Sequence, residues 1–275
     1  CLTSAQSKIS TKKWYPCNKG GEFQKWFGNE DYILNWKSDG YEIRNFKDET
    51  GALRSRPQNT QYFFKEGITW STVTMGKPSF RFSSAGRIFE SGGSTLFSIE
   101  EDIYFLLGVL NSKLGELAVG ILSPKVSLGE GAVAKFPIPK FDDEIKKSIS
   151  KIAYTLVEDF KNMEFFNESS FHFKGLDLLN SSEIFISDYS IRFQNFFNMK
   201  IEDIYEKERT IDDLISKQPL QNEKNNSNDR DVNEFSDEVV GQKILSYAIG
   251  CMMGRYSLDE PGLIYAHAGN QDFDA

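Results

Sequence analysis

The pattern of apolar residues changes near residue 98 of this 275-residue chain, and this change restricts the fold more than any other feature. Before it, short runs rich in β-branched and aromatic residues, such as Ile68–Val73 and Phe80–Ser83, are separated by turns that contain glycine. After it, apolar residues recur every three or four positions, as on one face of an α-helix. The sequence therefore predicts an α+β protein with an irregular, mostly-β first part and a helical second part.

The first predicted helix has recognisable ends. Ser98–Glu101 has the Ser-x-x-Glu spacing of a capping box, in which the serine side chain covers an unpaired amide, and Pro124 ends the pattern. Its apolar residues are expected to form one buried face: Ile103, Leu106, Leu107, Leu110, Leu114, Leu117 and Ile121. The prolines of residues 132–139 predict an extended segment, and Gly129 and Gly131 before it are interpreted as a plain loop.

A second long helix is expected at residues 141–166, because an apolar stripe runs from Phe141 to Met163. Packing within the chain explains a stripe of about three heptads better than a dimer zipper does. Residues 181–217 favour two shorter helices, residues 218–238 a polar, mobile loop, and Val239–Gly254 a final helix. We therefore expect a first domain at residues 1–140, a spacer helix at 141–166 and a C-terminal helical region at 167–275.

Composition excludes several classes of protein. No apolar run approaches 18 residues and the N-terminus lacks a signal pattern, so neither a membrane span nor secretion is expected. Three scattered cysteines indicate reduced thiols and a cytoplasmic location, and two distant histidines make a metal site unexpected. No Gly-Lys-Ser/Thr sequence occurs, which argues against a phosphate-binding P-loop. A start at Cys1 rather than Met suggests a fragment of a longer protein.

Charge is distributed unevenly along the chain. Residues 1–100 hold 14 Lys and Arg against 10 Asp and Glu, whereas residues 101–275 hold 18 against 30. Such an asymmetry is typical of a half that faces nucleic acid joined to an acidic half, although chance clustering explains it about as well.

Basic and amide side chains in the first half predict contacts to double-stranded DNA. Arg and Lys bind phosphates and guanine edges, and Asn and Gln bind adenine in the major groove. The Gly20–Gly21 pair permits close approach of the backbone to a partner, and a turn is expected at residues 49–51. The alternative is that these are solvated turn residues. The candidate DNA-binding residues are Lys12, Lys19, Lys25, Arg44, Arg54, Arg56, Gln58 and Asn59.

The segment from Lys13 to Gly28 resembles the corresponding stretch of the PglX family, which comprises adenine-specific DNA methyltransferases of BREX phage-defence systems related to type IIG restriction-modification enzymes. Further similarity is scattered over residues 43–71 and 247–259. Residues 106–112 and 135–139 are also similar to target-recognition domains of type I specificity subunits. This sequence has Cys17 and Phe27 where the family has Tyr or Trp.

The resemblance implies that residues 1–140 form a target-recognition domain, which would act with an N-terminal methyltransferase domain of the same polypeptide. That domain would bind S-adenosylmethionine and the target adenine. The chain itself has no Pro-Pro dipeptide, and hence no motif of the Asn-Pro-Pro-Tyr kind. No catalytic, cofactor-binding or metal-binding residue is therefore expected here. The alternative from a different class is a protein-interaction platform that docks other defence-system subunits or phage inhibitors. A self-contained nuclease or methyltransferase is a third hypothesis.

Overall fold

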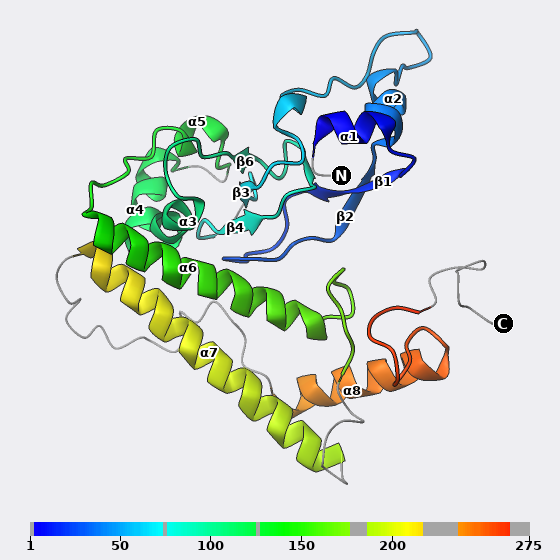
Figure 1. Cartoon of the computed structure of the whole chain (residues 1–275), viewed down its shortest axis with the longest axis vertical. Coiled ribbons are helices and arrows are strands. Elements are labelled where there is room, and N and C mark those ends of the chain that lie inside the picture. Colours follow the sequence, from blue (N-terminus) through cyan, green and yellow to red (C-terminus); the bar gives the residue numbers. More distant parts are fainter. Residues whose placement is uncertain (1–2, 74–75, 125–126, 177–185, 217–235, 265–275) are drawn as a thin grey trace. The chain divides into compact units, whose positions relative to one another are not determined.

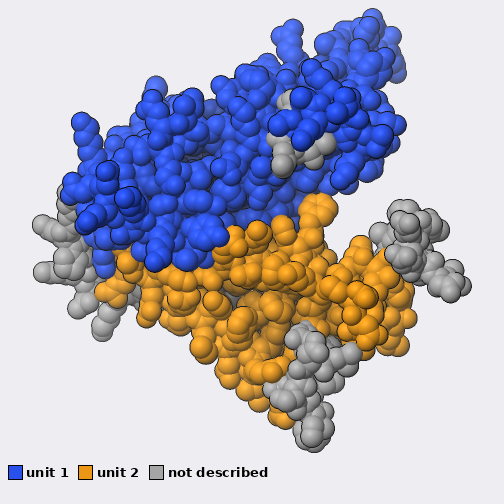
Figure 2. Space-filling view, viewed as in Figure 1, with its two compact units in different colours: residues 1–157, 211–219 blue, residues 158–210, 220–275 orange. Residues whose placement is uncertain are grey.

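The computed structural model describes residues 3–73, 76–124, 127–176, 186–216 and 236–264. The chain divides into two compact units: residues 1–157 with 211–219 form unit 1, and residues 158–210 with 220–275 form unit 2 (Figure 2). Both helices and small sheets are present, so the predicted α+β class is confirmed.

Two three-stranded sheets lie in the middle of unit 1, with helices α1 (Ser4–Ile9) and α2 (Lys37–Arg44) toward one end (Figure 1). In the first sheet, β1 (Trp14–Asn18) pairs antiparallel with β2 (Tyr32–Asn35) and parallel with β5 (Ile88–Phe89). In the second sheet, β3 (Gly67–Trp70) lies between β4 (Phe80–Ser83) and β6 (Thr95–Leu96), both antiparallel to it. The predicted strand at Phe80–Ser83 is confirmed.

An aromatic cluster stabilises the first sheet. Tyr15, Trp36, Phe63, Phe64 and Ile88 are each at most 5% exposed and pack together. Phe63 and Phe64 follow the short 3-10 helix η1 (Thr60–Tyr62), which delivers them to the sheet. Buried aromatic side chains of this size contribute much of the stability of a small sheet.

The first predicted helix is two helices, so its sequence-based description is wrong in two respects. It begins at Ile103 with Asp102 as N-cap, while Ser98 donates its hydroxyl hydrogen bond to the Glu101 carbonyl. It also breaks at Ser112, which separates α3 (Ile103–Asn111) from α4 (Lys113–Leu122). Ser112 Oγ accepts from the Gly115 amide and thereby caps α4.

The break changes which residues are buried. The apolar residues of α3 from Phe105 to Leu110 are buried, but Leu114, Leu117 and Ile121 of α4 are 39%, 62% and 71% exposed. The single buried face predicted for the whole segment is therefore wrong. Helical spacing is a local property, and it does not report a bend between two short helices.

Asn111 joins α3 to β4. Its side chain accepts from the Phe80 amide at 3.0 Å and donates to the Phe80 carbonyl at 2.8 Å, and both groups are buried. Replacing Asn111 with Ala removes the acceptor of the buried Phe80 amide and one of the two donors to the Phe80 carbonyl, which the Trp26 amide still reaches at 2.9 Å. We therefore expect a loss of about 2 kcal/mol in the free energy of unfolding. Urea denaturation measures this. An unchanged midpoint and slope would contradict it, with the exposed Asn45→Ala as the control.

Beyond α4, residues 130–133 form the short helix α5 (Glu130–Val133), so the plain loop predicted around Gly129 and Gly131 and the first part of the extended segment are wrong. The long helix α6 (Asp143–Met163) is followed by a 3-10 turn, η2 (Glu164–Phe166). Ile149, Leu156 and Phe160 of its stripe are buried. Gly108 lets α3 approach α6 closely, since a Cβ there would lie 2.6 Å from Ile149 Cγ2.

Unit 2 contains most of α7 (Ile186–Ser216) and all of α8 (Asp237–Met252). The prediction of two shorter helices over residues 181–217 is wrong, since no Gly or Pro interrupts residues 186–216 and one helix spans them. The hydrophobic core of unit 2 comprises Phe173, Leu176, Tyr189, Phe193, Phe197, Val240, Tyr247 and Tyr256.

The division into units falls inside α6, between Val157 and Glu158, so the domain boundaries expected at residues 140 and 166 stay predictions. The loop predicted at residues 218–238 lies mostly outside the described residues, and α8 already begins at Asp237. Within the described residues no single helix is long and apolar enough to cross a membrane. Helices α3 and α4 reach that length and apolar character only when taken together, and they are bent by 76° relative to each other.

Candidate nucleic-acid interface

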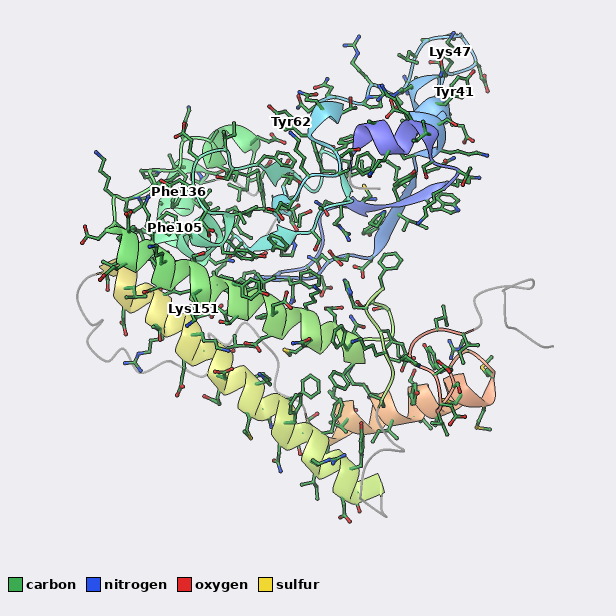
Figure 3. The ribbon with its side chains drawn as sticks, viewed as in Figure 1. Tyr41, Lys47, Tyr62, Phe105, Phe136 and Lys151 are labelled. Atoms are coloured by element: carbon green, nitrogen blue, oxygen red, sulfur yellow. The ribbon has the colours of Figure 1, made fainter. Side chains whose placement is uncertain are left out.

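Residues 41–59 extend from the body of unit 1, and we call them the arm (Figure 1). The arm continues from α2 through a turn and returns to η1. Figure 3 shows Tyr41 and Lys47 in its outer part. Four of the eight candidate DNA-binding residues lie in the segment that returns from the turn toward η1: Arg54, Arg56, Gln58 and Asn59. All four are exposed, so the structure brings them together on one accessible segment.

The arm is anchored at its base by a left-handed turn. Ser38, Asp39 and Gly40 all have positive φ, at 52°, 57° and 75°. A Cβ at Gly40 would lie 2.5 Å from the ring of Trp36, so only glycine fits there. Left-handed conformations are costly for Ser and Asp, and such local strain is retained only where the surroundings impose it.

Arg44 supplies part of that support. Its Nε donates to the Asp39 carbonyl at 2.7 Å, its guanidinium pairs with the Asp39 carboxylate at 3.3 Å, and it lies 5.1 Å from the centre of the Trp36 ring. Because these contacts engage the guanidinium, Arg44 holds the base of the arm in position. Its role in binding DNA directly stays a prediction.

The outer turn is closed by Asp48. Its Oδ1 accepts from the Thr50 amide at 3.0 Å, the Thr50 hydroxyl at 2.6 Å and the Ala52 amide at 3.0 Å. The Thr50 hydroxyl is the main reason that the pKa of Asp48 is lowered. The Asp48 amide donates to the Ala52 carbonyl, and Gly51 adopts a φ of 83°. The turn predicted at residues 49–51 is therefore confirmed.

Apolar side chains accompany the basic ones on the arm. Tyr41, Phe46 and Leu53 are 66%, 60% and 53% exposed. The Arg54 amide donates to the Phe46 carbonyl at 2.9 Å, which holds Arg54 beside the outward-facing phenylalanine. The Arg54 side chain is 64% exposed, and its Nε comes no closer than 3.9 Å to the Asp48 carboxylate. Its guanidinium therefore remains accessible.

The other candidate residues lie apart from the arm. Lys12 and Lys19 are exposed just beyond opposite ends of β1, and the Lys19 ammonium lies 4.7 Å from the centre of the Tyr32 ring. Lys25 is half-buried in the loop that follows β1. The eight residues therefore do not form one cluster, and the arm is the place where several of them converge.

The Gly20–Gly21 pair approaches a partner within the same chain. A Cβ at Gly20 would lie 2.7 Å from the Gly92 carbonyl oxygen, and one at Gly93 would lie 2.6 Å from the Asn18 backbone. The Gly21 amide donates to Ser71 Oγ, whose hydroxyl in turn donates to the Gly21 carbonyl. The interpretation that the pair admits an external partner is therefore not needed to explain these glycines.

Two buried arginines fix the loop around this pair, and sequence reasoning did not identify either of them. Arg81 is 1% exposed and donates to the Gln24 carbonyl and to Ser71 and Ser79. Burial lowers its pKa to about 10, so it remains charged at neutral pH. The alternation of residues 80–83 gave no signal of this, since an arginine between two phenylalanines is expected on the exposed face of a strand.

Arg87 makes a buried ion pair in unit 1. It lies 2.9 Å from Glu30 Oε1, and its Nε donates to Asn18 Oδ1 at 2.8 Å. Asn18 in turn donates to Ser83 Oγ at 2.7 Å. The network therefore connects β1, β4 and the start of β5 with the segment before β2.

Cys17 on β1 is buried, and desolvation raises the pKa of its thiol to about 11. The thiolate is the reactive form, so we expect alkylation of native Cys17 at pH 8 to be about 100-fold slower than in the unfolded chain. Iodoacetamide labelling followed by peptide mapping, with and without guanidinium chloride, measures this. Equal rates in the two states would contradict the buried placement.

Known proteins are similar to nearly the whole chain. It is 32% identical over 289 aligned residues to the adenine-specific methyltransferase BrxX of Escherichia coli O9:H4 strain HS, covering 95% of this chain and 22% of that protein. It is 31% identical over 286 aligned residues to the adenine-specific methyltransferase PglX of Lacticaseibacillus casei strain Zhang, covering 100% and 23%. The chain thus spans less than a quarter of the length of these relatives. No family model matches it.

Proposed function

The chain is a region of a PglX-family protein, as its resemblance predicted, and from this premise we propose that it reads the DNA target of an adenine-specific methyltransferase. Residues 1–140 are the target-recognition domain in this proposal. They bind double-stranded DNA in a sequence-specific manner and present an adenine to the methyltransferase domain of the same polypeptide.

The observation that carries the proposal is the composition of the arm. Arg54, Arg56, Gln58 and Asn59 lie on one exposed segment, and they are the side-chain types that bind guanine and adenine edges bidentately. The neighbouring exposed Phe46 offers an apolar surface to thymine methyl groups. A projecting segment held at its base enters a groove while the body of the domain contacts phosphates.

Chemistry belongs to the rest of the protein in this proposal. The sequence lacks the motif that would hold the target base, and the proposal places S-adenosylmethionine binding outside this segment. Binding of S-adenosylmethionine by the full-length protein is therefore expected to be independent of the arm, which provides a separate measure of correct folding.

Methylome sequencing of cells with and without the full-length protein tests the proposal. We expect one methylated adenine motif that depends on the protein, and a duplex with that motif should bind more tightly than a scrambled duplex. Replacing residues 46–59, which include all four of the proposed reading residues, with a glycine-serine linker should remove the methylation while S-adenosylmethionine still binds. Persistence of the same motif with the arm removed would exclude the arm as the reader.

A protein-interaction platform remains the second candidate, because α8 exposes apolar side chains. Leu245, Ile249 and Met252 are 61%, 43% and 87% exposed and recur at helical spacing. In this view unit 2 docks other defence-system subunits or phage inhibitors. Pull-down after nuclease treatment, comparing the wild type with Leu245→Ser/Met252→Ser, distinguishes the two. A partner that requires DNA would count against the platform.

A further inference from the structure

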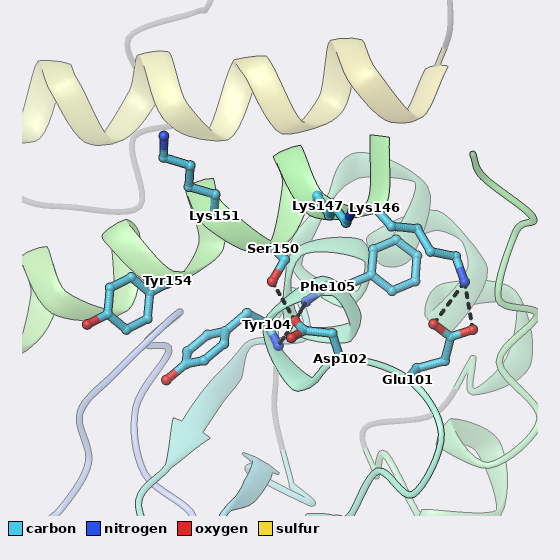
Figure 4. Close-up of a pocket in the computed structure, with 9 residues that line it drawn as sticks. All are labelled: Glu101, Asp102, Tyr104, Phe105, Lys146, Lys147, Ser150, Lys151 and Tyr154. Carbon is cyan, nitrogen blue, oxygen red and sulfur yellow. Dashed lines mark hydrogen bonds and ion pairs between the residues drawn. The ribbon is translucent and has the colours of Figure 1, made fainter. Parts of the chain in front are cut away.

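A pocket of about 360 Å³ lies in unit 1 where the start of α3 meets α6 (Figure 4). Its aromatic side comes from Tyr104 and Tyr154, whose rings meet edge to face with centres 5.2 Å apart. Tyr104 also stacks on Phe82 of β4 at 5.1 Å. The aromatic side is therefore held by contacts on two elements.

The carboxylates of the pocket are already compensated. Glu101 pairs with Lys146, whose Nζ lies 2.8 and 2.9 Å from its two oxygens. Asp102 Oδ1 accepts from the amides of Tyr104 and Phe105 at 2.9 Å and from the Ser150 hydroxyl at 2.5 Å. Glu101 is therefore neutralised by an ion pair, and one oxygen of Asp102 is occupied by three hydrogen-bond donors.

Lys147 and Lys151 supply the remaining charge. They are exposed and one helical turn apart on α6, and both line the pocket. Among the residues that the structure describes, neither forms an ion pair. Figure 4 shows Lys151 and Tyr154 extending from the same helix. The side chains that line the pocket thus carry two phenols and two ammonium groups that form no ion pair with a described residue, and these are donors that suit an anion.

We propose that this pocket binds a phosphodiester group of the DNA backbone. Lys147 and Lys151 neutralise the phosphate, and the rings of Tyr104 and Tyr154 pack against the adjoining sugar. Lysine suits this role because it binds phosphate as a point charge and needs no fixed fork geometry. The inference rests on the proposed function.

The pocket and the arm have different tasks. Lys151 lies far from Lys47 within unit 1 (Figure 3). Phosphate contacts carry no sequence information and instead fix the register of a protein on the duplex. The arm therefore selects the site and the pocket positions the duplex against it.

The test uses the full-length protein with Lys147→Gln/Lys151→Gln and the matched control Lys135→Gln/Lys140→Gln, which removes the same charge from two exposed lysines outside the pocket. Affinity for a site-containing and a scrambled duplex is measured over a salt series. We expect the slope of log affinity against log salt to become shallower by about 1 for the pocket variant, because the two lysines neutralise one phosphate and each lost phosphate contact changes the slope by about 1. The ratio of the affinities for the site-containing and the scrambled duplex should be the same in the pocket variant as in the wild type.

The control should keep the wild-type slope, and Lys147→Arg/Lys151→Arg should restore it. A wild-type slope in the Gln pocket variant, or an equal change in the control, would overturn the inference. If the wild type binds the site-containing and the scrambled duplex equally well, the proposed function is refuted instead. The salt dependence of the affinity for either duplex would still report on the pocket.

Discussion

Replacing both Arg54 and Arg56 with Ala in the full-length protein is expected to lower the preference for the target duplex at least about 30-fold and to remove site-specific methylation. A bidentate contact between an arginine and a base contributes about 1–3 kcal/mol of discrimination, so two lost contacts account for this change. Competition binding against a scrambled duplex and methylome sequencing measure the two effects.

The substitutions should leave the fold intact. Arg54 is 64% exposed, its ion pair with Asp48 is long, and exposed pairs of this kind contribute at most about 1 kcal/mol. Arg192→Ala/Arg209→Ala is the matched control, because it removes two exposed arginines from α7. Binding of S-adenosylmethionine should be unaffected in both proteins. Undiminished methylation at the same site in the arm variant would show that the arm does not read DNA.

Replacing Arg87 with Ala is expected to lower the free energy of unfolding of unit 1 by about 3–5 kcal/mol. Arg87 and Glu30 are 7% and 10% exposed, and removal of Arg87 takes its ion pair from a buried carboxylate. Asn18, which is 6% exposed, loses its hydrogen-bond donor as well. Urea denaturation followed by circular dichroism measures the loss.

A double variant separates this ion pair from simple loss of packing. Arg87→Met with Glu30→Leu removes both charges, so it should destabilise the protein by less than the sum of the two single substitutions. Arg54→Ala provides the exposed comparison, with an expected loss below about 1 kcal/mol. A loss that small for Arg87→Ala would contradict the expected cost of breaking the buried ion pair.

The arm explains why only part of the site was predictable. Its turn follows from Asp48, Thr50 and Gly51, whose side-chain and backbone preferences act over four residues. The accessibility of Arg54 and Arg56 follows from that turn. The clamp formed by Arg44 does not, because it requires the Trp36 ring and a left-handed Asp39 together. Nothing in the sequence around Arg44 predicts its contacts with Trp36 and Asp39.

The sequence by itself determined the α+β class, strand β4, the long helix α6 and the family, because these depend on residue spacing and on similarity along the chain. The tertiary structure decided the break at Ser112, the continuous helix α7, the buried arginines and the pocket beside Lys147. The physical reason is the distance along the chain between the residues that make these contacts. Arg87 is buried at no prohibitive cost because the Glu30 carboxylate pairs with it and Asn18, 69 positions earlier, accepts its hydrogen bond. Local spacing carries no information about partners so distant.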